Sequence, residues 1–179
     1  MPLAIAISDQ FETYFRRELR CAINVVETRI RPEFEEFGKN QANNVYGCRR
    51  IQENLKTRFE CPDCRRGYSK KRRWTSSLGV CVLIYKTTRL GSRHYRIEFA
   101  MYIYGSRCLQ CGQHGALKAY EDEYDRLGEV MGKKLCEGLG YRYPKEPRTQ
   151  RKSYTVNRRG HQKQHCNACR AGVCRAGRN

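Results

Sequence analysis

The chain has 179 residues, with 36 Lys and Arg against 18 Asp and Glu and a net charge of +18, which is enough for one compact domain and an accessory segment. No stretch approaches the about 20 apolar residues that a membrane-spanning helix needs, so we expect no membrane span in this chain. The 11 cysteines are an odd number, which does not suit a fully paired disulfide framework. We therefore expect a reducing compartment, the cytoplasm with the nucleus as a second location.

Residues 1–57 are predicted to form a helical N-terminal segment. Asp9 and Glu12 have the spacing of a capping box, which is typical of a helix start. The apolar residues that follow recur every three or four positions: Phe11, Phe15, Leu19, Ala22 and Val26. A further helix is predicted from the apolar residues Val45, Ile51 and Leu55.

From residue 58 onward the chain becomes strongly basic. Residues 58–179 hold 27 of the 36 basic residues but only 10 of the 18 acidic ones. A field of this sign attracts polyanions or acidic surfaces. The densest run, from Arg65 to Arg73, is predicted to be a solvated loop.

Two strands and one helix are predicted between residues 80 and 139. The first strand is Val80–Tyr85. The second, from His94 to Tyr104, alternates, so that its apolar residues share one face: Tyr95, Ile97, Phe99, Met101 and Ile103. Residues 121–139 have the spacing of an amphipathic helix, which Gly128 and Gly132 weaken.

Three Cys-x-x-Cys pairs are the most specific motifs in the chain. They are Cys61/Cys64, Cys108/Cys111 and Cys166/Cys169, and the third pair is followed by Cys174 and preceded by His161 and His165. A tetrahedral zinc site needs four nitrogen or sulfur ligands, and a pair two residues apart can grip one ion from a tight turn. Seven cysteines and one histidine therefore predict two closed, structural zinc sites, with two Zn²⁺ as cofactors.

The grouping of these donors has two solutions. We favour Cys61 and Cys64 with Cys108 and Cys111 on one ion, because the strands between them can return the second pair beside the first. The other ion is then held by the remaining four donors: His161, Cys166, Cys169 and Cys174. The alternative is an interleaved pattern in which the first and third pairs share an ion. Either way, we predict an α+β fold: a small zinc-ribbon-like antiparallel β domain at residues 58–179 with an amphipathic helix, preceded by the helical segment.

Residues 58–174 resemble the 3CxxC-type zinc finger family, which includes the receptor-transporting proteins and is similar to the zygote arrest proteins. The resemblance is carried by Phe59-x-Cys61-x-x-Cys64, Trp74-x-Ser76, Cys108-x-x-Cys111 and His161-x4-Cys166-x-x-Cys169-x4-Cys174. His161 stands at the family histidine position, so the resemblance favours it over His165 as the ligand.

Enzymatic motifs are not found in the sequence, so we expect a binding protein and no enzyme. The zinc deaminase signature, for example, needs His-x-Glu upstream of Pro-Cys-x-x-Cys, whereas Pro62 lies inside its pair. We expect RNA as the partner, bound by basic residues with exposed aromatic side chains for stacking. The basic candidates are Arg65, Arg66, Lys70, Lys71, Arg72, Arg73, Arg158 and Arg159, and the aromatic ones are Tyr68, Trp74, Tyr102 and Tyr104. For Trp74 we favour the alternative, a core residue packed against the hairpin. The resemblance also implies an alternative, an adaptor or chaperone that helps membrane receptors reach the cell surface.

Overall fold

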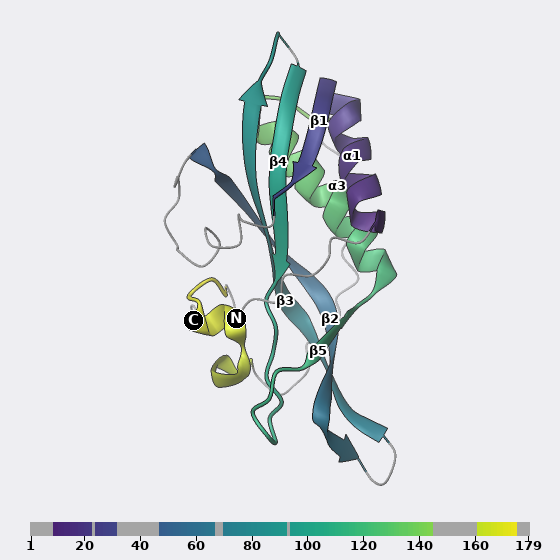
Figure 1. Ribbon diagram of the computed structural model, residues 1–179, viewed down its shortest axis with the longest axis vertical. Helices are drawn as coiled ribbons and strands as arrows, with labels where there is room; N and C mark the ends of the chain where they lie inside the picture. The colour runs from purple at the N-terminus through teal and green to yellow at the C-terminus, as the bar shows by residue number, and fades with distance from the viewer. Residues whose placement is uncertain are drawn as a thin grey trace.

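A mixed five-stranded sheet with two helices on one face forms the body of the protein (Figure 1). The computed structural model describes residues 9–22, 24–31, 47–66, 70–92, 94–144 and 161–174. In chain order the elements are α1 (Asp9–Ala22), β1 (Asn24–Ile30), β2 (Arg49–Arg66), β3 (Lys70–Arg89), β4 (His94–Ile103), β5 (Ala116–Ala119), α3 (Glu121–Gly138), the 3₁₀ turn η3 (Lys163–His165) and α4 (Asn167–Arg170).

The strand order in the sheet is β1-β4-β3-β2-β5. Strands β4, β3, β2 and β5 pair antiparallel, whereas β1 pairs with β4 in parallel. The predicted α+β, zinc-ribbon-like fold with an N-terminal helix is therefore confirmed, and the sheet is antiparallel except at β1. None of the helices described here is long and apolar enough to cross a membrane.

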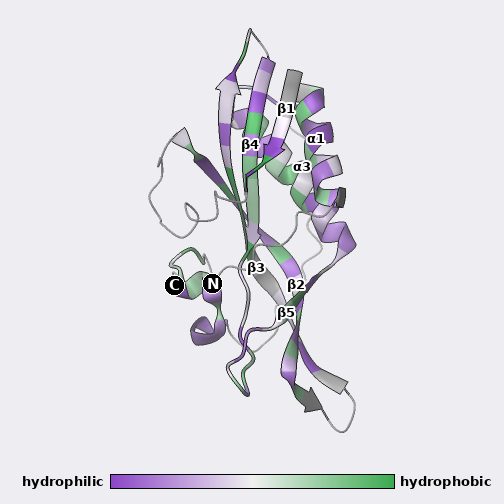
Figure 2. Ribbon diagram, in the orientation of Figure 1, coloured by the Kyte–Doolittle hydropathy of each residue, from purple (hydrophilic) through white to green (hydrophobic). Residues whose placement is uncertain are grey.

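The first core lies between the sheet and the helices α1 and α3. In β4 the residues predicted to share an apolar face do face this core. In Figure 2, β4 and both helices each carry hydrophobic and hydrophilic residues along their length, as elements with one buried side do. Phe15 of α1 meets Phe99 of β4 with ring centroids 5.0 Å apart. The largest fully buried side chains of the helices here are Phe11, Phe15, Leu19, Leu127, Met131 and Leu135.

Helices α1 and α3 approach each other closely at two glycines of α3. A Cβ atom at Gly128 would lie 2.7 Å from the Phe11 carbonyl oxygen, and one at Gly132 would lie 2.7 Å from Glu18 Cβ. The glycines that weaken the helical propensity of this segment are thus the residues that let α1 pack on it.

The second core lies on the opposite face of the sheet, beneath the C-terminal segment 161–174. Tyr102 of β4 and Tyr104, which directly follows this strand, are 3% and 6% exposed there. They pack with apolar residues of β3 and with Ala168, Val173 and Cys174 of the C-terminal segment. The sheet is therefore covered on both faces, by helices on one and by a cysteine-rich segment on the other.

The predicted helix around Ile51 and Leu55 is wrong, because these residues belong to β2. A spacing of four fits both a helical turn and two repeats of a strand. The residues that follow distinguish a strand from a helix. Thr57 and Phe59 are also buried, so from Leu55 onward every second residue is buried, as in a strand. Val45 lies outside the described residues. Similarly, α1 ends at Ala22 and the chain continues as β1, so Val26 is not helical.

Strand β2 also runs through the predicted division between residues 57 and 58. The N-terminal elements α1 and β1 lie against α3 and β4, whose residues belong to the second of the two predicted segments. The N-terminal segment and the cysteine-bearing segment thus share the first core.

Candidate metal centres

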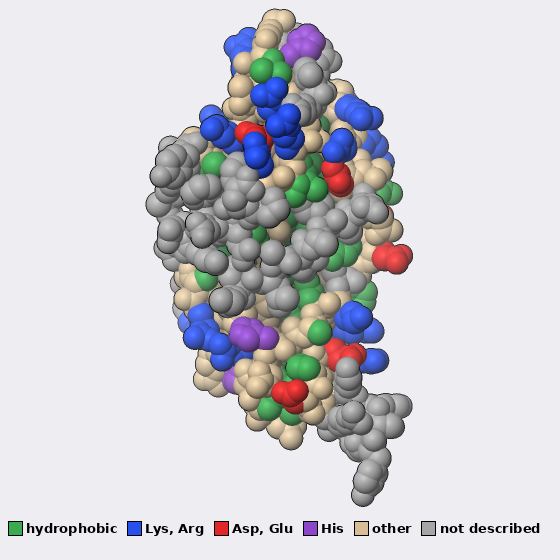
Figure 3. All heavy atoms as spheres, in the orientation of Figure 1, with side chains coloured by type: hydrophobic (Ala, Val, Ile, Leu, Met, Phe, Trp, Pro, Cys, Tyr) green, Lys and Arg blue, Asp and Glu red, His purple; other side chains and the backbone are tan. Residues whose placement is uncertain are grey.

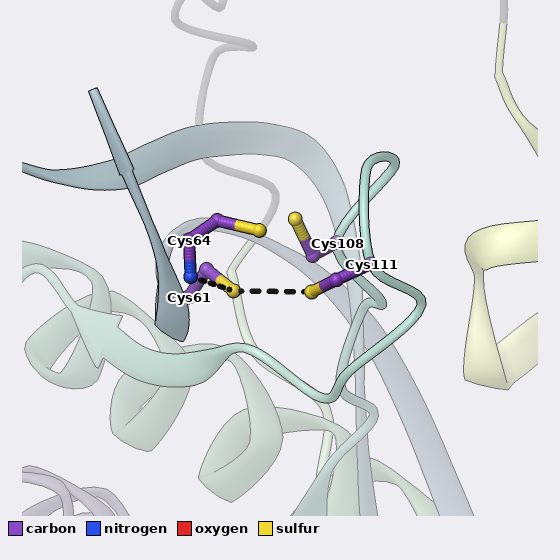
Figure 4. A group of neighbouring side chains, drawn as sticks. All are labelled: Cys61, Cys64, Cys108 and Cys111. Atoms are coloured by element: carbon purple, nitrogen blue, oxygen red, sulfur yellow. Dashed lines mark hydrogen bonds between the residues drawn. The ribbon is translucent and has the colours of Figure 1, made fainter. Parts of the chain in front are cut away.

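The first cysteine cluster joins strand β2 to the loop between β4 and β5. Cys61, Cys64, Cys108 and Cys111 place their sulfur atoms within 4.8 Å of one another. Figure 4 shows the four side chains converging on one point, with Cys61 Sγ and Cys111 Sγ 3.5 Å apart. Cys61 and Cys108 are fully buried, whereas Cys111 is exposed, so this cluster opens to solvent on one side.

The first pair is set into β2 as a bulge. The ladder to β3 passes from Glu60↔Arg73 directly to Arg65↔Lys71, so β2 advances five residues while β3 advances two. Residues 61–64 therefore lie opposite the single residue Arg72, and the backbone N–H of Cys64 donates to Cys61 Sγ at 3.3 Å. A bulge that bends the strand in this way aims both sulfur atoms to one side of the hairpin.

The second pair is a tight turn closed by a glycine. Gly112 has a φ of +74°, a left-handed conformation that favours glycine, and its N–H donates to the Cys108 carbonyl at 2.9 Å. Burial by itself would raise the pKa of the Cys108 thiol, but backbone N–H groups of Cys111 and Gln110 outweigh it and lower this pKa to about 7. The turn thus favours a thiolate, the form that binds metal.

The second cluster is local in sequence. His161, Cys166, Cys169 and Cys174 place their donor atoms within 4.8 Å of one another. His161 Nε2 lies 3.0 Å from Cys169 Sγ and 3.5 Å from Cys174 Sγ. Burial is the main cause that raises the pKa of Cys169, to about 12. His165 lies outside the cluster, which agrees with the preference for His161.

The second cluster is tied to the chain just before the second cysteine pair. Ser106 forms a β-bridge with Cys166, and the backbone N–H of Arg107 donates to the His165 carbonyl at 2.8 Å. Gln52 of β2 adds a side-chain hydrogen bond to the Val173 carbonyl at 2.7 Å. The loop 105–107 therefore connects the two clusters, since Cys108 follows it directly.

Both donor sets fit zinc. A tetrahedral ion with Zn–S near 2.3 Å and Zn–N near 2.0–2.1 Å places its ligand atoms about 3.5–3.8 Å apart. The closest donor pairs here lie 3.0–3.5 Å apart, which is equal to or slightly shorter than this ligand spacing. Four cysteines, or three cysteines and one histidine, are the donor sets of structural zinc sites, which leave no open position.

A family model described as a zinc-binding domain, the 3CxxC zinc ribbon, matches residues 54–172, about two thirds of the chain. The chain belongs to this family. The searches of curated proteins and of solved structures found no match to this chain. As a 3CxxC zinc ribbon with two such clusters, the protein is a zinc-binding module that fits two zinc ions. The structure groups the donors as the favoured sequence solution does, and not in the interleaved pattern.

None of the other cysteines is a donor in either cluster. Cys81 and Cys136 belong to the first core, and burial raises the pKa of the Cys136 thiol to about 11. Cys48 belongs to the second core. His114 accepts or donates one hydrogen bond with the Asn167 side chain at 3.2 Å, and it holds no place in a cluster.

The structure describes only six of the eight basic residues that were predicted to bind nucleic acid. Arg158 and Arg159 lie outside the described residues. The basic run is not the predicted loop: Arg65 and Arg66 end β2, and Lys70 to Arg73 begin β3. Arg72 donates to the Gln110 side chain, and Arg73 Nε donates to Glu60 at 2.8 Å.

The expected stacking platform is not formed by two of its candidates. Tyr102 and Tyr104 are buried under the C-terminal segment, because that segment covers this part of the sheet. Trp74 is half-buried and stacks on Phe59 with ring centroids 5.6 Å apart, while its indole N–H donates to Ser106 Oγ at 3.2 Å. Tyr68 lies outside the described residues.

Sequence reasoning missed the residues that support the clusters. Ser106 contacts both Trp74 and Cys166, and Gln110 accepts a hydrogen bond from Arg72. Gln110 could have been noticed because it lies inside the second Cys-x-x-Cys pair. Ser106 carries no motif, so only the fold reveals it.

Proposed function

We propose that this zinc-binding protein is a non-enzymatic module that binds RNA through a basic surface. One observation carries the proposal: the basic run forms the end of a long β-hairpin. We call this end, Arg65–Arg66 of β2 and Lys70–Arg73 of β3, the basic arm. In Figure 1 it extends downward beyond β5 and the cysteine loops.

The basic arm concentrates positive charge on a paired scaffold. Its ladder pairs Arg65 with Lys71 and Arg66 with Lys70, so cationic residues stand opposite one another on both strands. The sequence from Arg65 to Gly79 contains six Lys and Arg and no Asp or Glu. Like charges directly opposite destabilise a sheet, so this arrangement costs stability and is relieved when a polyanion binds.

The base of the arm is fixed to the first metal cluster. Cys61 and Cys64 directly precede it in β2, and Arg72 reaches Gln110 in the loop of the second pair. Arg73 pairs with Glu60, and its side chain is still 62% exposed. Zinc at the first cluster would therefore hold the arm in place, and the arm itself would make the phosphate contacts.

RNA is the partner that the sequence resemblance favours, since the zygote arrest proteins bind messenger RNA. Binding through Lys and Arg to phosphates releases counterions, so the affinity depends steeply on salt. Closed zinc sites supply no open position for catalysis, which supports a non-enzymatic role. A cytoplasmic location, with the nucleus as a second one, belongs to the same proposal.

Fluorescence anisotropy with a labelled single-stranded RNA, titrated with the zinc-loaded full chain between 50 and 200 mM salt, tests the proposal. We expect steep weakening with salt, and a lower slope for Arg65→Gln/Lys71→Gln, by about 0.7 for each phosphate that the variant no longer neutralises. The control Arg20→Gln/Arg142→Gln removes the same charge from exposed residues on the helix side.

The outcomes separate the alternatives. Equal binding by the arm variant and the control would show that the arm makes no contact. If the wild-type chain fails to bind RNA at 50 mM salt, the proposal is wrong. Co-purification with membrane receptors would then favour the adaptor role that the sequence resemblance also implies.

A further inference from the structure

A short ladder of backbone hydrogen bonds joins the two metal clusters. Residues 105–108 form its middle segment and end at Cys108, a ligand of the first cluster. One outer segment, 113–115, follows the second cysteine pair, and the other, 165–167, belongs to the second cluster. We call these three segments the bridging ladder. Two bridges define it: Arg107 with His114, and Ser106 with Cys166.

The backbone groups of the middle segment bond alternately to the two outer segments. Toward the second cluster, the N–H of Arg107 donates to the His165 carbonyl at 2.8 Å. Toward the second cysteine pair, the N–H of Cys108 donates to the Gln113 carbonyl at 2.8 Å. Each side has one more bond of this kind: Asn167 N–H to the Gly105 carbonyl at 3.2 Å, and Gly115 N–H to the Ser106 carbonyl at 3.0 Å.

From this geometry we infer that the two zinc sites are energetically coupled, so that filling the second cluster raises the zinc affinity of the first. Zinc binding at the second cluster orders residues 161–174 and presents the outer segment 165–167 to the middle segment. A middle segment that is already ordered loses less conformational entropy when Cys108 binds its ion. The coupling is reciprocal, because each site must change the affinity of the other by the same factor.

One side-chain hydrogen bond spans the two outer segments directly. The side-chain amide nitrogen of Asn167 lies 3.2 Å from Nδ1 of His114. Burial and the nearby charge of Arg107 lower the pKa of His114, so at pH 7 its neutral ring accepts the amide hydrogen. Asn167 is 7% exposed, and neither residue is a ligand of a cluster. The pair therefore acts as a positioning pair, which forms only when both outer segments are in place.

The bridging ladder can be altered without opening either core. His114 is half-buried, and in Figure 3 histidine side chains reach the surface in the lower part of the visible face, where Figure 1 shows the C-terminal segment in yellow. The residues that form the two cores do not include His114. Its replacement by alanine therefore removes the hydrogen bond and leaves the packing of both cores intact.

Competition with a chelator of known zinc affinity, followed by native mass spectrometry of the full chain, tests the coupling. Cys174→Ser gives the zinc affinity of the first site alone, and Cys111→Ser gives that of the second alone. The wild type gives the overall constant for both ions. The overall constant divided by the product of the two single-site constants is the coupling factor. We expect a factor between about 5 and 150, the usual range for coupled sites.

The positioning pair is tested by measuring the same factor after substitution in all three chains. His114→Ala should lower the coupling factor about fivefold, the typical effect of one hydrogen bond. His114→Asn keeps an acceptor near the position of Nδ1 and should restore the factor. The control Gln52→Ala removes the hydrogen bond from β2 to the Val173 carbonyl, outside the bridging ladder, and should leave the factor unchanged. A purely structural role would change the single-site constants and not their coupling.

Two results would overturn the inference. A coupling factor of one in the wild type means that the two clusters bind zinc independently. A factor that His114→Ala does not lower, or that Gln52→Ala lowers equally, means that the bridging ladder does not carry the coupling. Circular dichroism checks that each variant is folded. His161→Ala replaces Cys174→Ser, and Cys64→Ser replaces Cys111→Ser, where the first choice does not fold.

Discussion

Replacement of Gly128 by alanine should destabilise the protein although alanine is the better helix former. The new Cβ atom would lie 2.7 Å from the Phe11 carbonyl oxygen and 2.9 Å from the Phe15 backbone nitrogen. Both contacts are with backbone, so α1 itself must move. Overpacking of this kind costs about 1–3 kcal/mol, and the gain in helix propensity offsets about 1 kcal/mol. We expect a net loss of up to about 2 kcal/mol in the free energy of unfolding.

Gly138→Ala is the matched control, because it lies at the end of the same helix with room for a Cβ atom. Its nearest neighbours would be Tyr85 Oη at 3.4 Å and Arg49 Nη1 at 3.9 Å. We expect Gly138→Ala to be neutral or to gain up to about 1 kcal/mol. Urea denaturation at saturating zinc, followed by far-UV circular dichroism, measures both. If the Gly128→Ala variant proves as stable as the Gly138→Ala variant, the close approach of α1 and α3 is refuted.

Three further predictions concern the metal clusters. Cys111→Ser and Cys174→Ser should each reduce zinc content from two ions to one, as measured by native mass spectrometry; two ions in either variant would contradict the donor grouping. Chelation should change the fluorescence of Trp74, the single tryptophan, because it stacks on Phe59 beside the first cluster, whereas Cys174→Ser alone should change it little. Zinc affinity should rise between pH 6 and 8. The pKa of Cys64 is raised to about 12, chiefly by its hydrogen bond with Cys111, and burial raises the pKa of Cys169 to about 12. Both thiols are therefore protonated in this range, and zinc must displace their protons in order to bind. Calorimetry showing the same affinity at both pH values would be inconsistent with this.

The sequence predicted the parts of the fold that depend on local pattern. Alternation placed Ile97 and Phe99 of β4 on the correct face, and helical spacing located α3 to within a residue of its end. The cysteine pairs indicated two metal sites because a Cys-x-x-Cys turn is itself a local structure.

The rest depends on contacts between distant segments. The parallel pairing of β1 with β4 gives no periodicity of its own, and Ile51 and Leu55 fit two periods equally well. The burial of Tyr102 depends on a segment some 60 residues later in the chain, which the second cluster draws onto the sheet. The ion pair of Arg31 with Glu98 of β4 likewise follows from no spacing in the sequence.

The two clusters differ in how much chain must be ordered before each is complete. The second draws all its donors from residues 161–174, whereas the first joins Cys64 to Cys108 across the whole β3–β4 hairpin. Closing a long loop has a larger entropic cost and is slower than closing a short one. The C-terminal cluster can therefore capture its ion early in folding, while the first cluster must wait for the hairpin. Each molecule should thus acquire its two ions in sequence, with the arm ordered last.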